Sequence, residues 1–175
     1  MDIANSTTVS KLVLLYVFEN MEMPLTESTI IDLCCNRNAW ISYITCKEVL
    51  ADLIEIGFVL EETNPSGEKY YRITKDGNDC VSYFFMKIPI SLREEIAKFI
   101  KDNRVIFRRK QEYFRDYFQN KDGSYTVVMK IVDPMGTKLE LRLNASSRAN
   151  AKKIYERWES KASSIYSSIY DILID

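Results

Sequence analysis

Histidine is absent from this sequence of 175 residues. Its absence excludes Ser-His-Asp and Cys-His catalysis, zinc sites with imidazole ligands, and imidazole-based pH switching. Glycine and proline are scarce, at five and four residues, which disfavours glycine-rich phosphate loops and low-complexity linkers. No apolar run approaches the ~18 residues of a membrane span, and the N-terminus lacks the basic flank of a signal peptide. We therefore expect a cytoplasmic globular protein with no membrane partner.

Cysteine is present at only four positions, 34, 35, 46 and 80, and no two cysteines form a CxxC pair. A structural zinc site would need all four thiolates to converge, which the adjacent Cys34 and Cys35 make difficult. We expect small buried thiols in a reducing compartment, with no metal and no cofactor. Carboxylates such as Glu94 and Glu112 have neither a nucleophile nor a metal to pair with, so we do not expect an enzyme.

The net charge of −1 conceals an uneven distribution of charge. Residues 1–80 hold six basic and thirteen acidic side chains, a balance of −7, whereas residues 81–175 have a balance of +6. Such asymmetry indicates two units with different surfaces.

The first half of the sequence shows the element order of a winged helix-turn-helix domain. Two strand-like runs, 58–64 and 69–74, flank the turn-forming tetrapeptide PSGE. Apolar spacing and capping residues predict helices over 8–22, from Thr26 or Ser28 to about 37, from Ser42 to Gly57, and after Thr74. We expect Ile56 to be buried on the third of these helices, and Val81, Phe84 and Phe85 to be the apolar anchors of the fourth.

The second half predicts a helix, three strands and a helix. The tetrapeptide SLRE places a capping box at Ser91, at the start of a helix that runs to about 109. Turns separate three strand-like stretches, 111–119, 124–132 and 137–143, which indicates an antiparallel meander. The last helix starts near 147 and carries a heptad stripe. This stripe either packs within its own chain, on the sheet or back on the helix from Ser91, which we favour for 151–162, or forms a dimer seam at Ile165, Ile169 and Ile172.

A family resemblance supports this order of elements. The stretch YYRITKDG, residues 70–77, resembles the second wing strand and the following helix of bacterial winged-helix regulators. With LLYVFENMEMPLT, YITCKEVLADLIEIGFVLEE and IPISLREEI, the whole chain is similar to the bacterial family catalogued as domain of unknown function 4364. That family is regarded as one of transcriptional regulators, so the resemblance implies a winged-helix fold and a regulatory role.

These observations predict an α+β protein with a winged helix-turn-helix domain at 1–88 and an α-β-β-β-α module at 89–175. We expect a DNA-binding transcriptional regulator that acts as a homodimer on double-stranded DNA. The second module would supply dimerisation or sensing of a small-molecule effector of unknown identity. The alternative is a winged-helix module that binds protein and not DNA, because the N-terminal half is acidic whereas affinity for a duplex rests on cations.

The predicted DNA contacts lie on the third helix and on the hairpin: Ser42, Tyr43, Thr45, Lys47, Asn64, Ser66, Lys69 and Arg72. A second group of cations, Arg104, Arg108, Arg109 and Lys110, would contact phosphate or an acidic partner. Equally, these cations would be the solvated end of a helix, where they complement its dipole.

Overall fold

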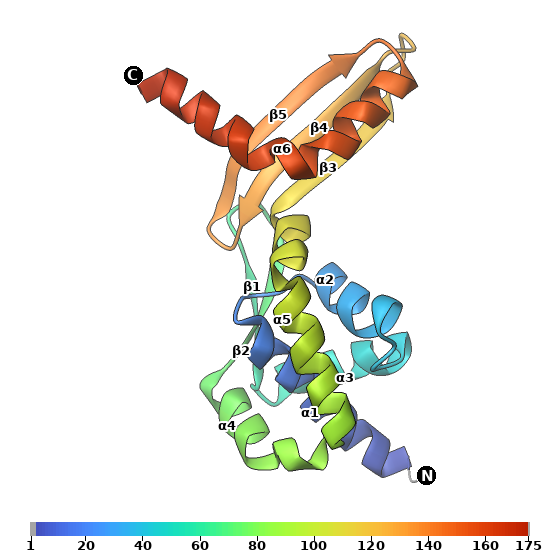
Figure 1. Ribbon diagram of the computed structural model, residues 1–175, viewed down its shortest axis with the longest axis vertical. Coiled ribbons are helices and arrows are strands. Elements are labelled where there is room, and N and C mark those ends of the chain that lie inside the picture. The colour runs from blue at the N-terminus through green and yellow to red at the C-terminus, as the bar shows by residue number, and fades with distance from the viewer. Residues whose placement is uncertain (1–2, 175) are drawn as a thin grey trace. The chain divides into compact units, whose positions relative to one another are not determined.

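The computed structural model describes residues 3–174 as a mixed α/β chain with a two-stranded and a three-stranded antiparallel sheet. The chain divides into two compact units, Met1–Phe107 and Arg108–Asp175 (Figure 1). Residues 1, 2 and 175, at the ends of the two predicted domains, lie outside the described residues. Among residues 3–174, no helix combines the length and hydrophobicity that a membrane crossing requires.

The boundary between the units lies inside helix α5 (Ile90–Glu112), whereas the sequence predicts a boundary at 88/89. The reason is that Ile96, Ile100 and Phe107 of α5 are buried in the N-terminal core, so most of this helix belongs to the first unit. The helix also begins directly after Pro89. Ser91 therefore lies inside its first turn and not at the predicted capping position.

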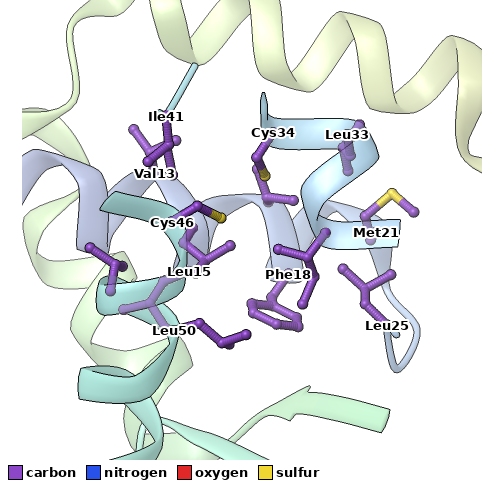
Figure 2. Close-up of a cluster of buried hydrophobic side chains, with 14 of the residues drawn as sticks. Val13, Leu15, Phe18, Met21, Leu25, Leu33, Cys34, Ile41, Cys46 and Leu50 are labelled. Atoms are coloured by element: carbon purple, nitrogen blue, oxygen red, sulfur yellow. The ribbon is translucent and has the colours of Figure 1, made fainter. Parts of the chain in front are cut away.

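The N-terminal unit is built around α1 (Ile3–Met21), a helix that carries apolar side chains on nearly every side. Val13, Leu15 and Phe18 of this helix lie within the buried cluster shown in Figure 2. Helices α3 and α4 and the hairpin all contact α1. A helix with apolar residues all round needs partners on several sides, and these elements supply them.

Two short helical segments lead from α1 to the third helix of the sequence prediction. Helix α2 (Glu27–Ile31) continues into the π-helical turns of η1 (Asp32–Arg37), and α3 (Tyr43–Glu55) follows a short link. Thr26 caps α2 and Ser42 caps α3, each through a side-chain oxygen that accepts a backbone N–H bond. The predicted caps are confirmed, but no sequence signal marked the π-helical turns.

Buried thiols form part of this core. Cys34 on η1 and Cys46 on α3 are inaccessible to solvent and lie near each other among the apolar side chains (Figure 2). A hydrogen bond with Cys46, together with burial, raises the pKa of Cys34. Burial also raises the pKa of the neighbouring Cys35 to about 12. These two free thiols therefore remain protonated, and hence weakly nucleophilic, at neutral pH.

The predicted hairpin consists of β1 (Val59–Thr63) and β2 (Lys69–Ile73), which pair in antiparallel register. A further segment, absent from the sequence prediction, pairs with β2. Leu25 and Tyr71 exchange backbone hydrogen bonds of 2.9 and 2.8 Å as an isolated antiparallel bridge. This bridge fastens the chain between α1 and α2 to the hairpin.

Helix α4 (Lys75–Phe84) begins at the predicted cap, Thr74, whose hydroxyl oxygen accepts the backbone N–H of Gly77. Gly77 lies against the chain that enters the hairpin. A Cβ atom on this residue would come within 2.3 Å of the Phe58 carbonyl oxygen. The close approach of α4 to Phe58 therefore requires glycine at position 77.

Of the three predicted anchors of α4, Val81 is buried, but Phe84 and Phe85 are 47% and 38% exposed, so their predicted packing in the core is wrong. Helix α4 ends at Phe84 and the chain turns into the short η2 (Phe85–Lys87). There the Lys87 ammonium lies 5.0 Å from the Phe84 ring centroid, and the Arg93 guanidinium lies 4.8 Å from that of Phe85. The two rings contact cations at the surface and do not enter the core.

The C-terminal unit has two layers. Strands β3 (Tyr113–Gln119), β4 (Tyr125–Asp133) and β5 (Gly136–Ala145) form an antiparallel meander with β4 in the centre. Helix α6 (Arg148–Ile174) contacts all three strands. The core of the unit is small and joins β4 and the end of β5 to α6. It consists of Val127, Met129, Ile131, Ala145, Ala151, Trp158 and Ala162. The stripe over 151–162 thus packs within its own unit, and it covers the sheet, one of the two partners that the sequence left open.

Candidate functional site

The outer face of α3 is the first part of the predicted site. Cys46, Val49, Leu50 and Leu53 face the core, so Tyr43, Ile44, Glu48 and Ala51 lie on the opposite, exposed side. At the start of the helix, the Ser42 hydroxyl lies 2.8 Å from that of Thr45 and also caps the helix. Both predicted contact residues thus hold the helix start in place, with Ser42 exposed and Thr45 half-buried.

Lys47, the one cation among the predicted DNA contacts of α3, is directed toward α2. Its ammonium donates a hydrogen bond to the Glu27 carboxylate, and the two side chains are 41% and 42% exposed. This hydrogen bond raises the pKa of Lys47, so the ammonium remains charged at neutral pH. Lys47 therefore lies beside the exposed face of α3 with its charge balanced by a carboxylate.

The hairpin tip contains two of the predicted contacts, and the structure gives them different surroundings. Asn64 is buried, and its side-chain oxygen accepts the backbone N–H groups of Ser66 and Glu68 at 3.0 and 2.9 Å. Asn64 thus stabilises the turn from inside. Ser66 and the neighbouring Gly67, whose φ is +88°, are exposed at the tip. The accessible surface of the tip is therefore that of Ser66 and Gly67.

The two hairpin cations form ion pairs across the strands. Lys69 lies 2.9 Å from Glu61, and Arg72 lies 2.8 Å from Glu62, with each pair joining residues diagonal to each other in the register. The hydrogen bond from Lys69 lowers the pKa of Glu61. The sequence places these acids and bases on adjacent strands, but only the register shows which carboxylate meets which cation.

Charge on this surface is therefore balanced locally and acidic overall. Helix α3 and the hairpin together carry three cations and six carboxylates. Lys47, Lys69 and Arg72 each pair with a glutamate, whereas Glu48 and Glu55 are exposed on α3. The predicted contact residues on α3 and the hairpin therefore do not form a basic patch.

Apolar side chains also contribute to this surface. Tyr43 is 57% exposed and Ile44 is 69% exposed at the start of α3. At the other end of the helix, Ile56 is exposed as well, so its predicted burial is wrong. The reason is local: Ile56 is the C-cap, and the left-handed φ of +80° at Gly57 turns the chain away from the core stripe.

The four cations of α5 that the sequence singled out as phosphate or partner contacts do not share one environment. Arg104 pairs with Glu22 at 3.1 Å, and Arg108 pairs with Glu112 one turn further along at 3.0 Å. Arg109 and Lys110 lie in the last turn of the helix, where cations complement the helix dipole. The placement of Arg109 and Lys110 fits one of the two interpretations drawn from the sequence, that of cations at the end of a helix.

The three isoleucines of the predicted seam differ in exposure along α6. Ile165 packs on the C-terminal core, Ile169 is half-buried, and Ile172 is almost fully exposed. The stripe thus changes from core to surface along the last turns of the helix. Ile165 belongs to the unit's own packing, and Ile172 does not.

The comparisons with known proteins concern both units. The model of the family described as domain of unknown function (DUF4364) matches residues 10–173, from α1 to the end of α6. The chain belongs to this family, which confirms the family resemblance seen in the sequence. No curated protein and no solved structure matches the chain.

Proposed function

We propose that the protein is a cytoplasmic, non-enzymatic DNA-binding regulator of transcription whose N-terminal unit is a winged helix-turn-helix domain. The observation that carries this proposal is the exposed face of α3 beside the hairpin. Helices α1, α2 and α3 precede the hairpin, and the Leu25–Tyr71 bridge adds the minimal third strand to it. In this arrangement α3 would enter the major groove and the hairpin tip would contact the adjacent backbone.

The exposed residues of α3 suit contact with a duplex. Tyr43 and Ile44 are free of the core, and an aromatic phenol or an aliphatic side chain can meet base edges and the thymine methyl group. Ser66 and Gly67 present small groups at the hairpin tip, so the backbone there can approach phosphate closely.

The paired cations remain usable by DNA. Exposed ion pairs such as Lys47–Glu27 typically stabilise a protein by at most about 1 kcal/mol, because solvent screens them. An approaching phosphate can therefore replace the glutamate as partner at small cost. The affinity of this surface for DNA should nevertheless be modest, since the surrounding carboxylates repel phosphate. Its salt dependence should be shallow, because α3 and the hairpin offer only three cations to neutralise phosphates.

The test of this proposal compares three charge variants of the full chain. Sequences bound by the parent protein are first selected from a random duplex pool, and binding is then titrated at two salt concentrations by fluorescence anisotropy. Lys47→Glu should weaken binding and reduce the salt slope by about one, because one phosphate contact is lost. Glu27→Gln should tighten binding about two- to fivefold, because it releases Lys47 and removes one negative charge.

A matched control carries the same charge change in the C-terminal unit. Lys153 is exposed on α6 of the C-terminal unit and belongs to neither α3 nor the hairpin, so Lys153→Glu should leave both affinity and salt slope at the parent values. If the pool yields no enriched sequence and the parent chain shows no binding at low salt, the DNA-binding proposal is abandoned.

The second candidate is a winged-helix module that binds protein, and one observation favours it specifically. The surface combines exposed Tyr43 and Ile44 with an excess of carboxylates, which suits a basic, partly apolar peptide better than a polyanion. On this candidate, Tyr43→Ala would abolish binding to the protein partner, and Glu27→Gln would weaken it. The two functions therefore predict opposite effects of the same Glu27 substitution.

A further inference from the structure

The C-terminal end of α6 extends past the core of its own unit (Figure 1). Tyr166 is the last residue of the helix that packs against this core. Ile172 and Leu173 are each 78% exposed, and Tyr170 and Ile174 are more than half exposed. We refer to residues 169–174 as the C-terminal arm. Three consecutive apolar residues, 172–174, place apolar surface on several sides of the arm, which is unusual for a helix end in water.

The same unit contains an apolar groove. It lies between α6 and the sheet, measures about 360 Å³, and is lined by Leu141 and Leu143 of β5 and by Ile154 and Ile165 of α6, among others. Two cations, Arg157 and Lys161, also line this α6–β5 groove. Neither has an acidic partner among residues 3–174.

The arm and the groove are complementary in charge as well as in polarity. Asp171 is the single charged residue in the segment 162–174. An arm in the groove would bring this carboxylate to the two unpaired cations while its apolar side chains cover the groove wall. Opposite charges at the rim of an apolar contact fix its register and orientation.

The arm cannot fill the groove of its own chain. It continues α6 directly from Ile165, which is itself part of the groove wall, so a return would require α6 to break. A second copy of the chain has no such constraint. Each copy has one arm and one groove, so two reciprocal insertions fill both grooves and bury both arms. No further copy can then bind in this way, and the assembly is a symmetric dimer.

We propose that the protein forms a homodimer in which the C-terminal arm of each copy inserts into the α6–β5 groove of the other, with Asp171 paired to Arg157 and Lys161. Ile172, Leu173 and Ile174 become buried in this dimer, whereas Ile165 contributes to the groove that receives them. The proposal concerns the C-terminal unit alone and is independent of DNA binding.

The oligomeric state of the full chain tests this proposal by sedimentation equilibrium over micromolar concentrations. The parent chain should be a dimer. Ile172→Asp should raise the dimer dissociation constant about thirtyfold or more, as expected for a central apolar anchor. The variant should remain folded, because the side chain is exposed in the single chain. Met135→Asp, at a turn residue that is 83% exposed, is the matched control and should leave the dimer intact.

A charge exchange tests the register of the two copies. Asp171→Arg alone and Arg157→Asp alone should each weaken the dimer, and their combination should restore it toward the parent dissociation constant. A monomeric parent chain, or a dimer that Ile172→Asp leaves unchanged, would overturn the proposal. If the combined variant is weaker than both single variants, the pairing of Asp171 with Arg157 is wrong and the inserted register is overturned.

Discussion

The two units bury their apolar surface in different ways. In the N-terminal unit, α1 is enclosed by α3, α4 and the hairpin, so many side chains share one large core. In the C-terminal unit, a single helix covers one face of three strands, and the rings of Phe114 and Phe118 on β3 are about half exposed. The stability of the second unit therefore depends on a few buried side chains. Its helix continues beyond the residues that pack against the sheet.

The largest effect expected from this contrast concerns Trp158, the largest side chain of the C-terminal core. Trp158→Ala should reduce the stability of this unit by about 4 kcal/mol and unfold it or nearly so, because few neighbours can close the cavity. Circular dichroism should record the loss of helix and strand. Trp40 is then the only remaining tryptophan, and its indole donates a hydrogen bond to Glu95 within the N-terminal unit.

Fluorescence of Trp40 therefore serves as the internal control for the Trp158 variant. The cooperative unfolding of the N-terminal unit should persist in denaturant with an unchanged midpoint. If the Trp40 transition disappears together with the C-terminal signal, the two units do not fold independently and the contrast between their cores is lost.

A smaller effect is expected for Gly77 in the N-terminal unit. Gly77→Ala forces a Cβ atom against the Phe58 carbonyl oxygen, so α4 must shift and the unit should lose about 3 kcal/mol. Urea unfolding followed by fluorescence measures this loss, in chains that also carry Trp158→Phe so that Trp40 is the only tryptophan. Ser82→Ala, on the exposed side of the same helix, should change the stability by a few tenths of a kcal/mol. Equal stabilities of the two variants would contradict the close approach of α4.

The smallest effect is a dependence on pH that involves the hairpin. Burial and a hydrogen bond with Glu61 raise the pKa of Tyr71 to about 12, above the ordinary value of 10.0. The folded state thus favours the neutral phenol, whose contribution is complete below pH 10 and is lost as the pH rises from 10 to 12. The loss is at most about 2.7 kcal/mol.

Tyr71→Phe isolates this contribution, because the variant keeps the buried ring and removes the ionisable hydroxyl. The stability of the parent N-terminal unit should fall more steeply between pH 10 and 12 than that of the variant, as measured by urea unfolding at each pH. Parallel pH profiles would show that Tyr71 does not titrate differently in the folded state.

The sequence predicts much of the fold because its strongest signals are local. Thr74 and Ser42 cap the helices where predicted, and Gly57 ends α3 in a left-handed conformation. These features depend on a few neighbouring residues and on well-known backbone preferences. Alternation and turn residues similarly placed the three strands of the C-terminal unit to within a few residues.

The features that the sequence could not predict depend on contacts between distant residues. The Leu25–Tyr71 bridge joins a residue before α3 in the sequence to one after it. No local pattern distinguishes Leu25 from a loop residue. Lys47 is placed on the expected side of α3, but its pairing with Glu27 depends on how α2 packs. Phe84 and Phe85 are of a residue type that is usually buried, and only the change from α4 to η2 brings them to the surface.

The distribution of cysteine allows the opening of the N-terminal core to be measured separately from the rest of the chain. All four thiols lie between residues 34 and 80, and the sequence of the C-terminal unit contains none. Because Cys34 and Cys46 are inaccessible to solvent, a thiol-modifying reagent can reach them only when the core around α1 opens. The rate at which these two sulfur atoms are modified under native conditions therefore measures how often that core opens. The C-terminal unit does not contribute to this rate, because it has no thiol.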